Sequence, residues 1–223
     1  MTSGAQALAA IEPPLRYGAL AACRACPRLA DHLAAIRRDH PAYHAAPVAP
    51  WGAKSARLLI VGLAPGMHGA NRTGRPFTGD ASGAFLFESL YRAGFATTAD
   101  ANTARLVNAR ITNAVRCLPP ANRPTASEIA NCLGYLNHEL RELWRPGVRR
   151  RRCVLALGRI AHDAVIRAAG RPPAGFAHGA EREIAPGLTL LDTYHPSRQN
   201  TNTGRLTRDM LDRVALRAAG LLG

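Results

Sequence analysis

Residues 56–80 read ARLLIVGLAPGMHGANRTGRPFTGD, and this stretch decides the fold class. The run at 56–63 is short, apolar and followed by turn formers, which is typical of a strand that is buried on both faces. The twenty residues from 61 to 80 contain five glycines and two prolines. Such small side chains directly after a buried strand indicate a place where the backbone lies very close to a ligand or to another segment.

Three further apolar runs have the same character, and each is followed by turn formers and then by a helical pattern. Because parallel strands need crossover connections, usually helices, this alternation predicts an α/β protein. We expect a three-layer α/β/α sandwich with a central four-stranded parallel sheet. The other strands are expected at 108–115, 152–158 and 188–195, and the helices at 82–93, 125–143, 159–169 and 208–222.

The chemistry of such a sheet is expected beyond the carboxyl ends of its strands, where open α/β sheets bind their ligands. Polar or proline-rich segments follow three of the four predicted strands. They are APGMHGANRTGRPFTGD at 64–80, RCLPPANRP at 116–124 and HPSRQNTNTG at 195–204.

Length and composition favour a single domain. With 223 residues and 47% hydrophobic content, the chain can bury one sizeable core and is short for two. We expect one domain over residues 1–223, with 1–50 as an N-terminal helical extension packed on the sheet. The N-terminal stretch MTSGAQALAAIEPPL has no basic start and no long apolar run, so we expect a soluble, cytoplasmic protein with no membrane partner.

The formal net charge of +14 predicts attraction to polyanions, of which nucleic acid is the commonest. The basic residues are almost all arginine, which suits bidentate contact with phosphate. A solvated arginine surface that reflects a GC-rich genome is the alternative.

The five cysteines are not expected to form disulfides, because a reducing cytoplasm keeps thiols unpaired. Cys23 and Cys26 form a Cys-x2-Cys pair, and Cys117 and Cys132 could close a four-thiolate metal site. Zinc and an iron-sulfur cluster both accept this donor set, and four unrelated buried thiols are the third possibility. Cys153 begins a predicted strand and is expected in the core.

The glycine-rich loop lacks both common phosphate-binding spacings, GxGxxG and GxxxxGK[ST]. A loop that lets a flat base and its sugar approach the backbone also favours glycine. A turn without any ligand is the plain alternative.

Three motifs carry a resemblance to a known family: GLAPGMHGANRTGRPFTGDASG at 62–83, TNAVRC at 112–117 and HPSRQNTNTGRLT at 195–207. With the four cysteines, they resemble the uracil-DNA glycosylase superfamily, and within it the iron-sulfur B-type class, also called family 5. The resemblance covers about Cys23 to Thr207. It implies removal of deaminated bases from DNA and a structural four-iron four-sulfur (4Fe-4S) cluster on Cys23, Cys26, Cys117 and Cys132.

Two positions differ from better-known uracil glycosylases. Those enzymes carry Asp or Asn where this chain has Ala64, and the A-type iron-sulfur enzymes carry glutamate where it has Leu63. Both differences match the B-type class, whose candidate water-positioning carboxylate is Asp80. Ala64 and Gly66 are expected to line the base pocket, and the small Ala64 implies tolerance of hypoxanthine and xanthine beside uracil.

The resemblance also assigns roles by motif position. His195 would donate a hydrogen bond to uracil O2, Asn113 would read the base edge with its amide, and Phe77 would stack on the base. Asp80 would orient water or stabilise the sugar cation, and Asn200 would assist catalysis or base recognition. Each has a structural alternative: a strand cap for His195, loop contacts for Asn113, core packing for Phe77, a helix N-cap for Asp80 and a turn for Asn200.

The segment after His195 is polar and basic, as expected of a loop that enters a DNA groove. Ser197 is expected to hold a phosphate, and Arg198 and Gln199 to fill the gap that a flipped base leaves. The predicted protein is therefore a monomeric, monofunctional glycosylase that acts on DNA containing uracil or other deaminated bases. A non-catalytic iron-sulfur DNA-binding module is the alternative, but such a module has no need of His195 beside a groove loop.

Overall fold

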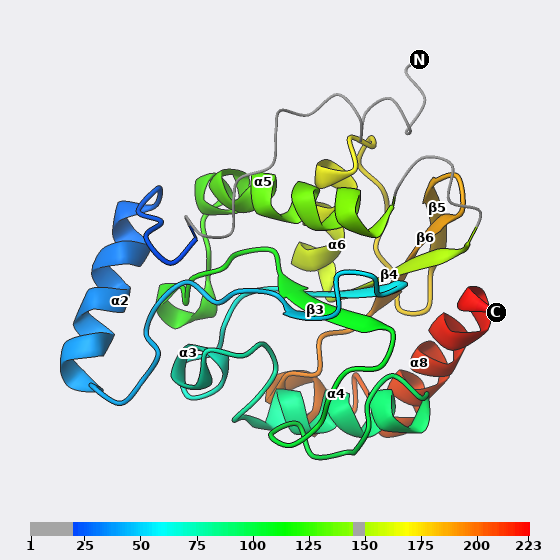
Figure 1. The fold of residues 1–223 in the computed structure, drawn as a ribbon, viewed down its shortest axis with the longest axis horizontal. Coiled ribbons are helices and arrows are strands. Elements are labelled where there is room, and N and C mark those ends of the chain that lie inside the picture. Colours follow the sequence, from blue (N-terminus) through cyan, green and yellow to red (C-terminus); the bar gives the residue numbers. More distant parts are fainter. Residues whose placement is uncertain (1–19, 145–149) are drawn as a thin grey trace.

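The computed structural model describes residues 20–144 and 150–223. Helices cover both faces of one central sheet (Figure 1). The helices are α2 (Pro27–Asp39), α3 (Ala70–Thr73), α4 (Ala81–Arg92), α5 (Ala126–Leu143), α6 (Arg159–Ala168), α7 (Arg198–Asn202) and α8 (Arg208–Leu222), with a 3-10 turn η2 (Pro120–Asn122). The strands are β1 (Trp51–Gly52), β2 (Leu58–Gly62), β3 (Ala109–Asn113), β4 (Arg152–Leu157), β5 (Glu181–Ala185) and β6 (Leu188–Thr193).

The sheet has six strands, not the four expected, in the order β1-β3-β2-β4-β6-β5. The four predicted strands are its central members and pair in parallel, whereas β1 and β5 add antiparallel edges. The expectation missed β1 because it has only two residues. It missed β5 because an edge strand needs little apolar sequence, and the first three residues of EREIA are exposed.

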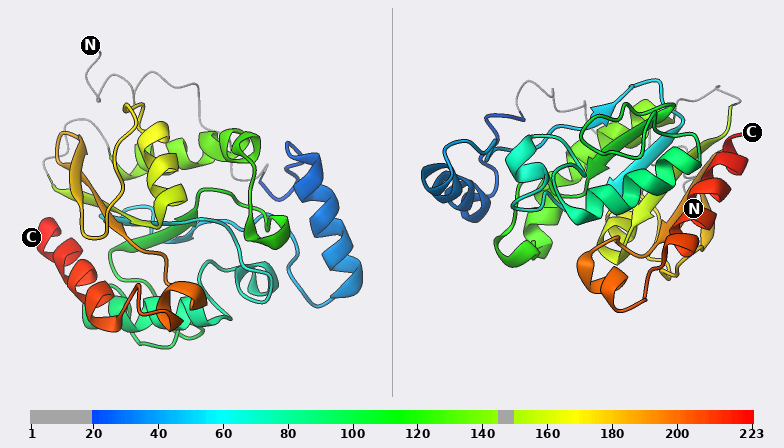
Figure 2. Two further views of the ribbon diagram at one scale, coloured as in Figure 1. Left: turned by 180° about the vertical axis from the view of Figure 1, so that it is seen from behind. Right: turned by 90° about the horizontal axis from the view of Figure 1, so that it is seen from below.

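Side chains alternate across β2, as the pleat of a strand requires. Leu58 and Ile60 pack with α4 and α8, while Leu59 and Val61 pack with α5 and α6. Two views from other directions show the same helix pairs on opposite sides of the sheet (Figure 2). Cys153 is fully buried in β4, in the core as expected.

The described part of the N-terminal extension forms one helix, α2, near one end of the sheet. Helix α2 buries Leu29, Leu33 and Ile36 against residues that follow β3, including Val115 and Leu118. This places α2 beside the carboxyl end of the sheet, where it is close to the segment that joins β3 to α5 (Figure 1). The part of the expectation that concerns residues 1–19 lies outside the described residues.

Across residues 20–144 and 150–223, no helix combines the length and the apolarity needed to cross a membrane.

Candidate active site

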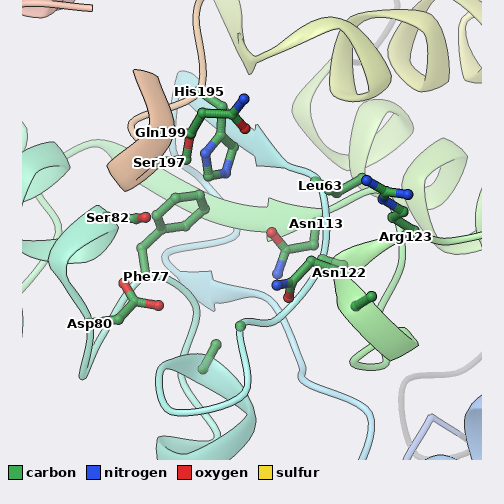
Figure 3. A pocket seen from close by; sticks show the side chains of 14 residues that line it. Leu63, Phe77, Asp80, Ser82, Asn113, Asn122, Arg123, His195, Ser197 and Gln199 are labelled. Carbon is green, nitrogen blue, oxygen red and sulfur yellow. The ribbon is translucent and has the colours of Figure 1, made fainter. Parts of the chain in front are cut away.

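A cavity of about 530 Å³ opens at the carboxyl ends of β2, β3 and β6. Its walls come from segments that are far apart in the sequence (Figure 3). This is the position at which parallel α/β sheets bind ligands. The residues that line it are Leu63, Ala64, Gly66, Ala70, Phe77, Asp80, Ser82, Asn113, Ala121, Asn122, Arg123, His195, Ser197 and Gln199.

Phe77 and Asn113 meet over a glycine of the central strand. Gly62 is the register partner of Asn113, and a Cβ atom at Gly62 would overlap the Asn113 amide and lie 2.6 Å from the Phe77 ring. Phe77 itself has a φ of 54°, which is uncommon for a residue other than glycine. The missing side chain of Gly62 therefore makes room for both pocket side chains.

The Asn113 side chain is an amide with unused hydrogen-bonding capacity. The residue is 3% exposed, and its Oδ1 atom has no hydrogen-bond partner among the residues that the structure describes. A buried amide oxygen without a partner costs free energy. Because Asn113 lines the cavity, a ligand with a suitable donor can supply the missing bond.

His195 follows β6 and lies over Phe77, with 5.8 Å between the ring centroids. Gly158 has a φ of 90° and leaves room for the His195 side chain, because a Cβ atom at position 158 would lie 3.2 Å from His195 Cβ. Asn200 donates from Nδ2 to the His195 carbonyl oxygen at 2.8 Å. Burial lowers the pKa of His195 to about 4, so its imidazole is neutral at physiological pH.

The low pKa of His195 predicts a titration midpoint near 4 in imidazole nitrogen NMR spectra. The eight histidine signals can be assigned to His195 by comparison with a His195→Ala variant. Since the unfolded chain titrates near pH 6.5, this group stabilises the fold fully above that pH, and the stabilisation is lost as the pH falls toward 4. A midpoint at or above pH 6 would contradict the burial argument.

Asp80 has two uses for its carboxylate. It is the N-cap of α4, and its Oδ1 accepts a hydrogen bond from the Gly83 backbone N–H at 2.9 Å. The second oxygen lies against two glycines, since a Cβ atom at Gly69 would overlap Asp80 Oδ2 and one at Gly66 would lie 3.1 Å from it. The cap thus orients the carboxylate while the glycine-rich loop leaves it space.

Most of the site residues predicted from the sequence line this cavity. The structure brings Ala64, Gly66, Phe77, Asp80, Asn113, His195, Ser197 and Gln199 together there. Asn200 lines a neighbouring cavity, which it shares with His195 and Gln199, and its amide supports the His195 backbone. Arg198 lies in an adjoining groove with Phe85 and Arg208. Ser197 is the N-cap of α7.

Six lining residues were not predicted: Leu63, Ala70, Ser82, Ala121, Asn122 and Arg123. The last three belong to the proline-rich segment after β3, whose position at a strand end was itself a signal. Their individual contribution could not be foreseen, because η2 turns through left-handed conformations at Ala121 and Asn122, with φ values of 53° and 56°.

The four cysteines of the predicted cluster gather beside the cavity. Cys117 and Cys132 are buried with α2 in one apolar group, and Cys26 packs against it. Burial, together with the neighbouring thiols of Cys132, Cys23 and Cys26, raises the pKa of Cys117 to about 12. All are free thiols.

In the described part of the chain, no three His, Cys, Asp or Glu side chains are arranged closely enough to hold a metal ion. The donor chemistry fits an iron-sulfur cluster, because four cysteine thiolates are its usual ligands.

Comparison with known proteins agrees with these observations. The family model described as "Uracil DNA glycosylase superfamily" matches residues 49–217. A "Type-5 uracil-DNA glycosylase" of Thermus thermophilus is 45% identical over 92% of this chain and 95% of that protein. Proteins of the same name from Mycobacterium bovis and Pyrobaculum aerophilum are each 44% identical, over 92% and 90% of this chain and 80% and 89% of theirs.

The profile match spans most of the chain and includes every lining residue of the cavity. The relatives extend the similarity to the N-terminal cysteine pair, because they cover nine-tenths of the chain or more. This chain therefore belongs to the uracil DNA glycosylase superfamily and is an enzyme of its type-5 class.

Proposed function

We propose that this enzyme removes uracil from DNA by hydrolysing the bond between base and sugar, which leaves an abasic site. The observation that carries the proposal is that Phe77, Asn113 and His195 line one cavity. They offer a flat ring, an amide that donates and accepts, and an imidazole N–H. A flipped base needs these groups for binding and for stabilisation as it leaves. The names of the type-5 relatives support uracil as the main substrate.

Base recognition is assigned to Phe77 and Asn113. Stacking on the Phe77 ring suits any flat base, so this contact does not select. The Asn113 amide can donate to one base oxygen while its free Oδ1 accepts from a ring N–H. This exchange would give the buried Oδ1 the partner that it lacks.

Stabilisation of the departing base is assigned to His195. When the glycosidic bond breaks, its electron pair moves to the base, and positive charge develops on the sugar. A neutral imidazole keeps one N–H group, and by donating it to uracil O2 it stabilises the anion. Its pKa of about 4 supports this neutral form.

Asp80 is assigned to the sugar side of the reaction. Its carboxylate can stabilise the positive sugar or orient the attacking water. The oxygen of that water becomes the new hydroxyl group at C1′, and the proton that the water loses neutralises the base anion. The hydrogen bond from Gly83 N–H to Oδ1 leaves Oδ2 available for this purpose. Asn200 contributes indirectly, because its amide hydrogen bond fixes the backbone of His195.

DNA contact is assigned to Ser197, Arg198 and Gln199. Arg198 and Gln199 are exposed beside the cavity mouth, as residues that fill the gap left by a flipped base must be. Ser197 would hold a phosphate, and the net charge of +14 supports attraction to DNA.

We also propose that the pocket accepts hypoxanthine and xanthine. Ala64 lines the cavity with a single methyl group where other uracil glycosylases carry an amide or a carboxylate. Less bulk and fewer fixed polar groups at that position make the pocket less exclusive.

The test of both proposals is strand cleavage of a labelled duplex that contains one modified base, after treatment with enzyme and then hot alkali. We expect cleavage at uracil, slower cleavage at hypoxanthine, and none in the same duplex with thymine. Absence of cleavage at uracil would contradict the proposed function. If uracil were removed while hypoxanthine stayed intact at high enzyme excess, only the broad specificity would be wrong.

We further propose that Cys23, Cys26, Cys117 and Cys132 hold a 4Fe-4S cluster with a structural role. When bound, such a cluster cross-links the segments that carry its ligands. Cys26, Cys117 and Cys132 lie in one apolar cluster, and Cys23 is close enough to the Cys117 thiol to affect its pKa, which supports this assignment.

Iron analysis tests the cluster with a matched pair of variants. Cys117→Ser removes a proposed ligand, whereas Cys153→Ser changes a thiol in β4 that is also buried. After anaerobic purification we expect about four iron atoms per chain and visible absorbance in the wild type and in Cys153→Ser. We expect both to be strongly reduced in Cys117→Ser. Iron-free wild-type protein, or zinc in place of iron, would contradict the proposal.

A further inference from the structure

The cavity wall formed by Ala121, Asn122 and Arg123, called here wall 121–123, lies across from Phe77 (Figure 3). Its internal support is weak. Asn122 and Arg123 donate their backbone N–H groups only to Pro119 and Pro120, at 3.0 and 3.1 Å. Two consecutive non-glycine residues in left-handed conformations need support from surrounding structure.

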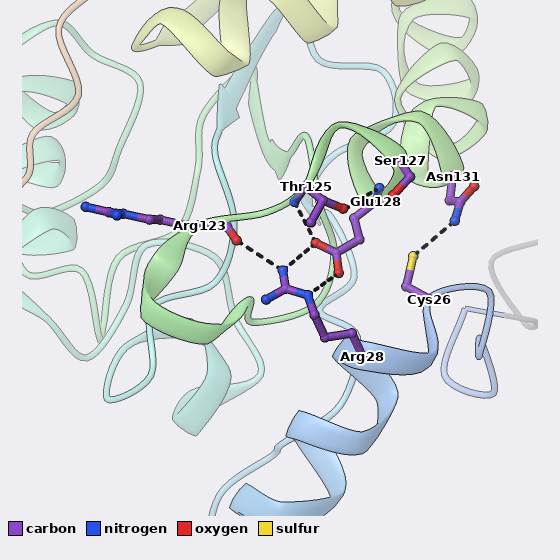
Figure 4. A network of polar contacts seen from close by, with 7 residues as sticks. All are labelled: Cys26, Arg28, Arg123, Thr125, Ser127, Glu128 and Asn131. Carbon is purple, nitrogen blue, oxygen red and sulfur yellow. Dashed lines mark hydrogen bonds and ion pairs between the residues drawn. The ribbon is translucent and has the colours of Figure 1, made fainter.

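That support comes from Arg28 of helix α2. Its Nη2 donates to the Arg123 carbonyl oxygen at 3.1 Å (Figure 4). Within the described parts of the chain, this is the one hydrogen bond that reaches wall 121–123 from outside residues 119–128. The wall therefore depends on a residue nearly one hundred positions earlier in the sequence.

Arg28 is itself held in place by Glu128. The guanidinium contacts both carboxylate oxygens, with Nε to Oε1 at 2.8 Å and Nη2 to Oε2 at 2.7 Å. Glu128 is 5% exposed and also accepts from the Thr125 backbone N–H at 2.7 Å, which completes the capping box of α5. Because two bonds to Glu128 fix the plane of the Arg28 guanidinium, the second N–H of Nη2 can point at the Arg123 carbonyl oxygen.

The N-terminus of α2 is docked at a second place. Asn131 of α5 donates to the Ala25 carbonyl oxygen at 3.1 Å and to Cys26 Sγ at 3.4 Å. Arg28 follows Cys26 by two residues, and Leu29 is fully buried beside it. The position of Arg28 is therefore set by the docking of the whole helix.

We propose that Arg28 is a positioning residue for substrate, an inference that rests on the proposed function. By holding the Arg123 carbonyl, Arg28 keeps Asn122 and Arg123 at the cavity rim where a flipped nucleotide enters. The groups assigned to the leaving base and to the sugar, His195 and Asp80, come from other segments. Loss of Arg28 should thus weaken substrate capture and leave the chemical step nearly unchanged.

The chain offers a matched control for this test. Arg217 of α8 donates to Glu181 of β5 in the same two-point geometry, from Nε to Oε1 at 2.6 Å and from Nη2 to Oε2 at 2.8 Å. Neither residue lines the cavity. We compare Arg28→Met with Arg217→Met in steady-state assays on a duplex containing uracil. Hydrogen exchange of the amides at 121–123 is measured on the same proteins.

For Arg28→Met we expect KM to rise about tenfold, kcat to stay within about twofold, and exchange at 121–123 to accelerate. Arg217→Met should match the wild type in all three. Arg28→Lys keeps the charge but lacks the fork, so it should fall between them. Glu128→Gln, which can still cap α5, provides a second variant if Arg28→Met folds poorly. It should act in the same direction.

Equal behaviour of Arg28→Met and Arg217→Met would overturn the proposal, as would faster exchange with an unchanged KM. Wild-type enzyme that leaves uracil in place would instead contradict the proposed function. In that case the exchange rates alone still decide whether Arg28 holds wall 121–123.

Discussion

Replacing His195 with alanine is expected to lower the rate of uracil excision by about 100- to 1,000-fold, the usual effect of removing one donor to a developing anion. The ring lies against Phe77 inside the cavity and is neutral, so its N–H is a donor at physiological pH. The measurement is single-turnover excision from a uracil duplex at saturating enzyme, which separates the chemical step from binding.

Two variants complete the His195 experiment. His195→Gln can place an amide N–H near the position of Nε2, so we expect it to recover part of the lost rate. His32→Ala changes a half-buried histidine on α2 that does not line the cavity, and it should match the wild type. A His195→Ala rate within tenfold of the wild type would remove His195 from the leaving-group role.

Replacing Gly62 with alanine is expected to lower kcat/KM by at least about 100-fold, because misplaced binding groups have effects of this size. The added methyl group would overlap the Asn113 amide and lie 2.6 Å from the Phe77 ring. Both side chains would have to move from the positions in which they line the cavity. Overpacking of this central strand should also cost about 1–3 kcal/mol of stability.

Gly175→Ala is the matched control for Gly62→Ala. A Cβ atom at Gly175 meets nothing within 4 Å, and the residue is exposed. Its activity and melting temperature should equal those of the wild type. Melting curves establish whether Gly62→Ala is folded at the assay temperature. A folded Gly62→Ala enzyme with nearly normal kcat/KM would show that neither Phe77 nor Asn113 contacts the base.

The central sheet was predictable because its signal is local. Parallel strands buried on both faces are rich in apolar residues, and four such runs became β2, β3, β4 and β6. The edge strands β1 and β5 were not predictable, since one is very short and the other is half exposed. Helix α2 was expected, but its docking at the carboxyl end of the sheet was not.

The sequence by itself determined the parallel core and the motifs whose residues line the cavity, because apolar periodicity and strand-end position are properties of short segments. Only the tertiary structure decided which residues form wall 121–123 and what supports it. The left-handed turn at Ala121 and Asn122 and the contact from Arg28 to Arg123 depend on packing between distant segments. An ion pair between residues 28 and 128 leaves no local pattern, since its partners become neighbours only when α2 docks against α5.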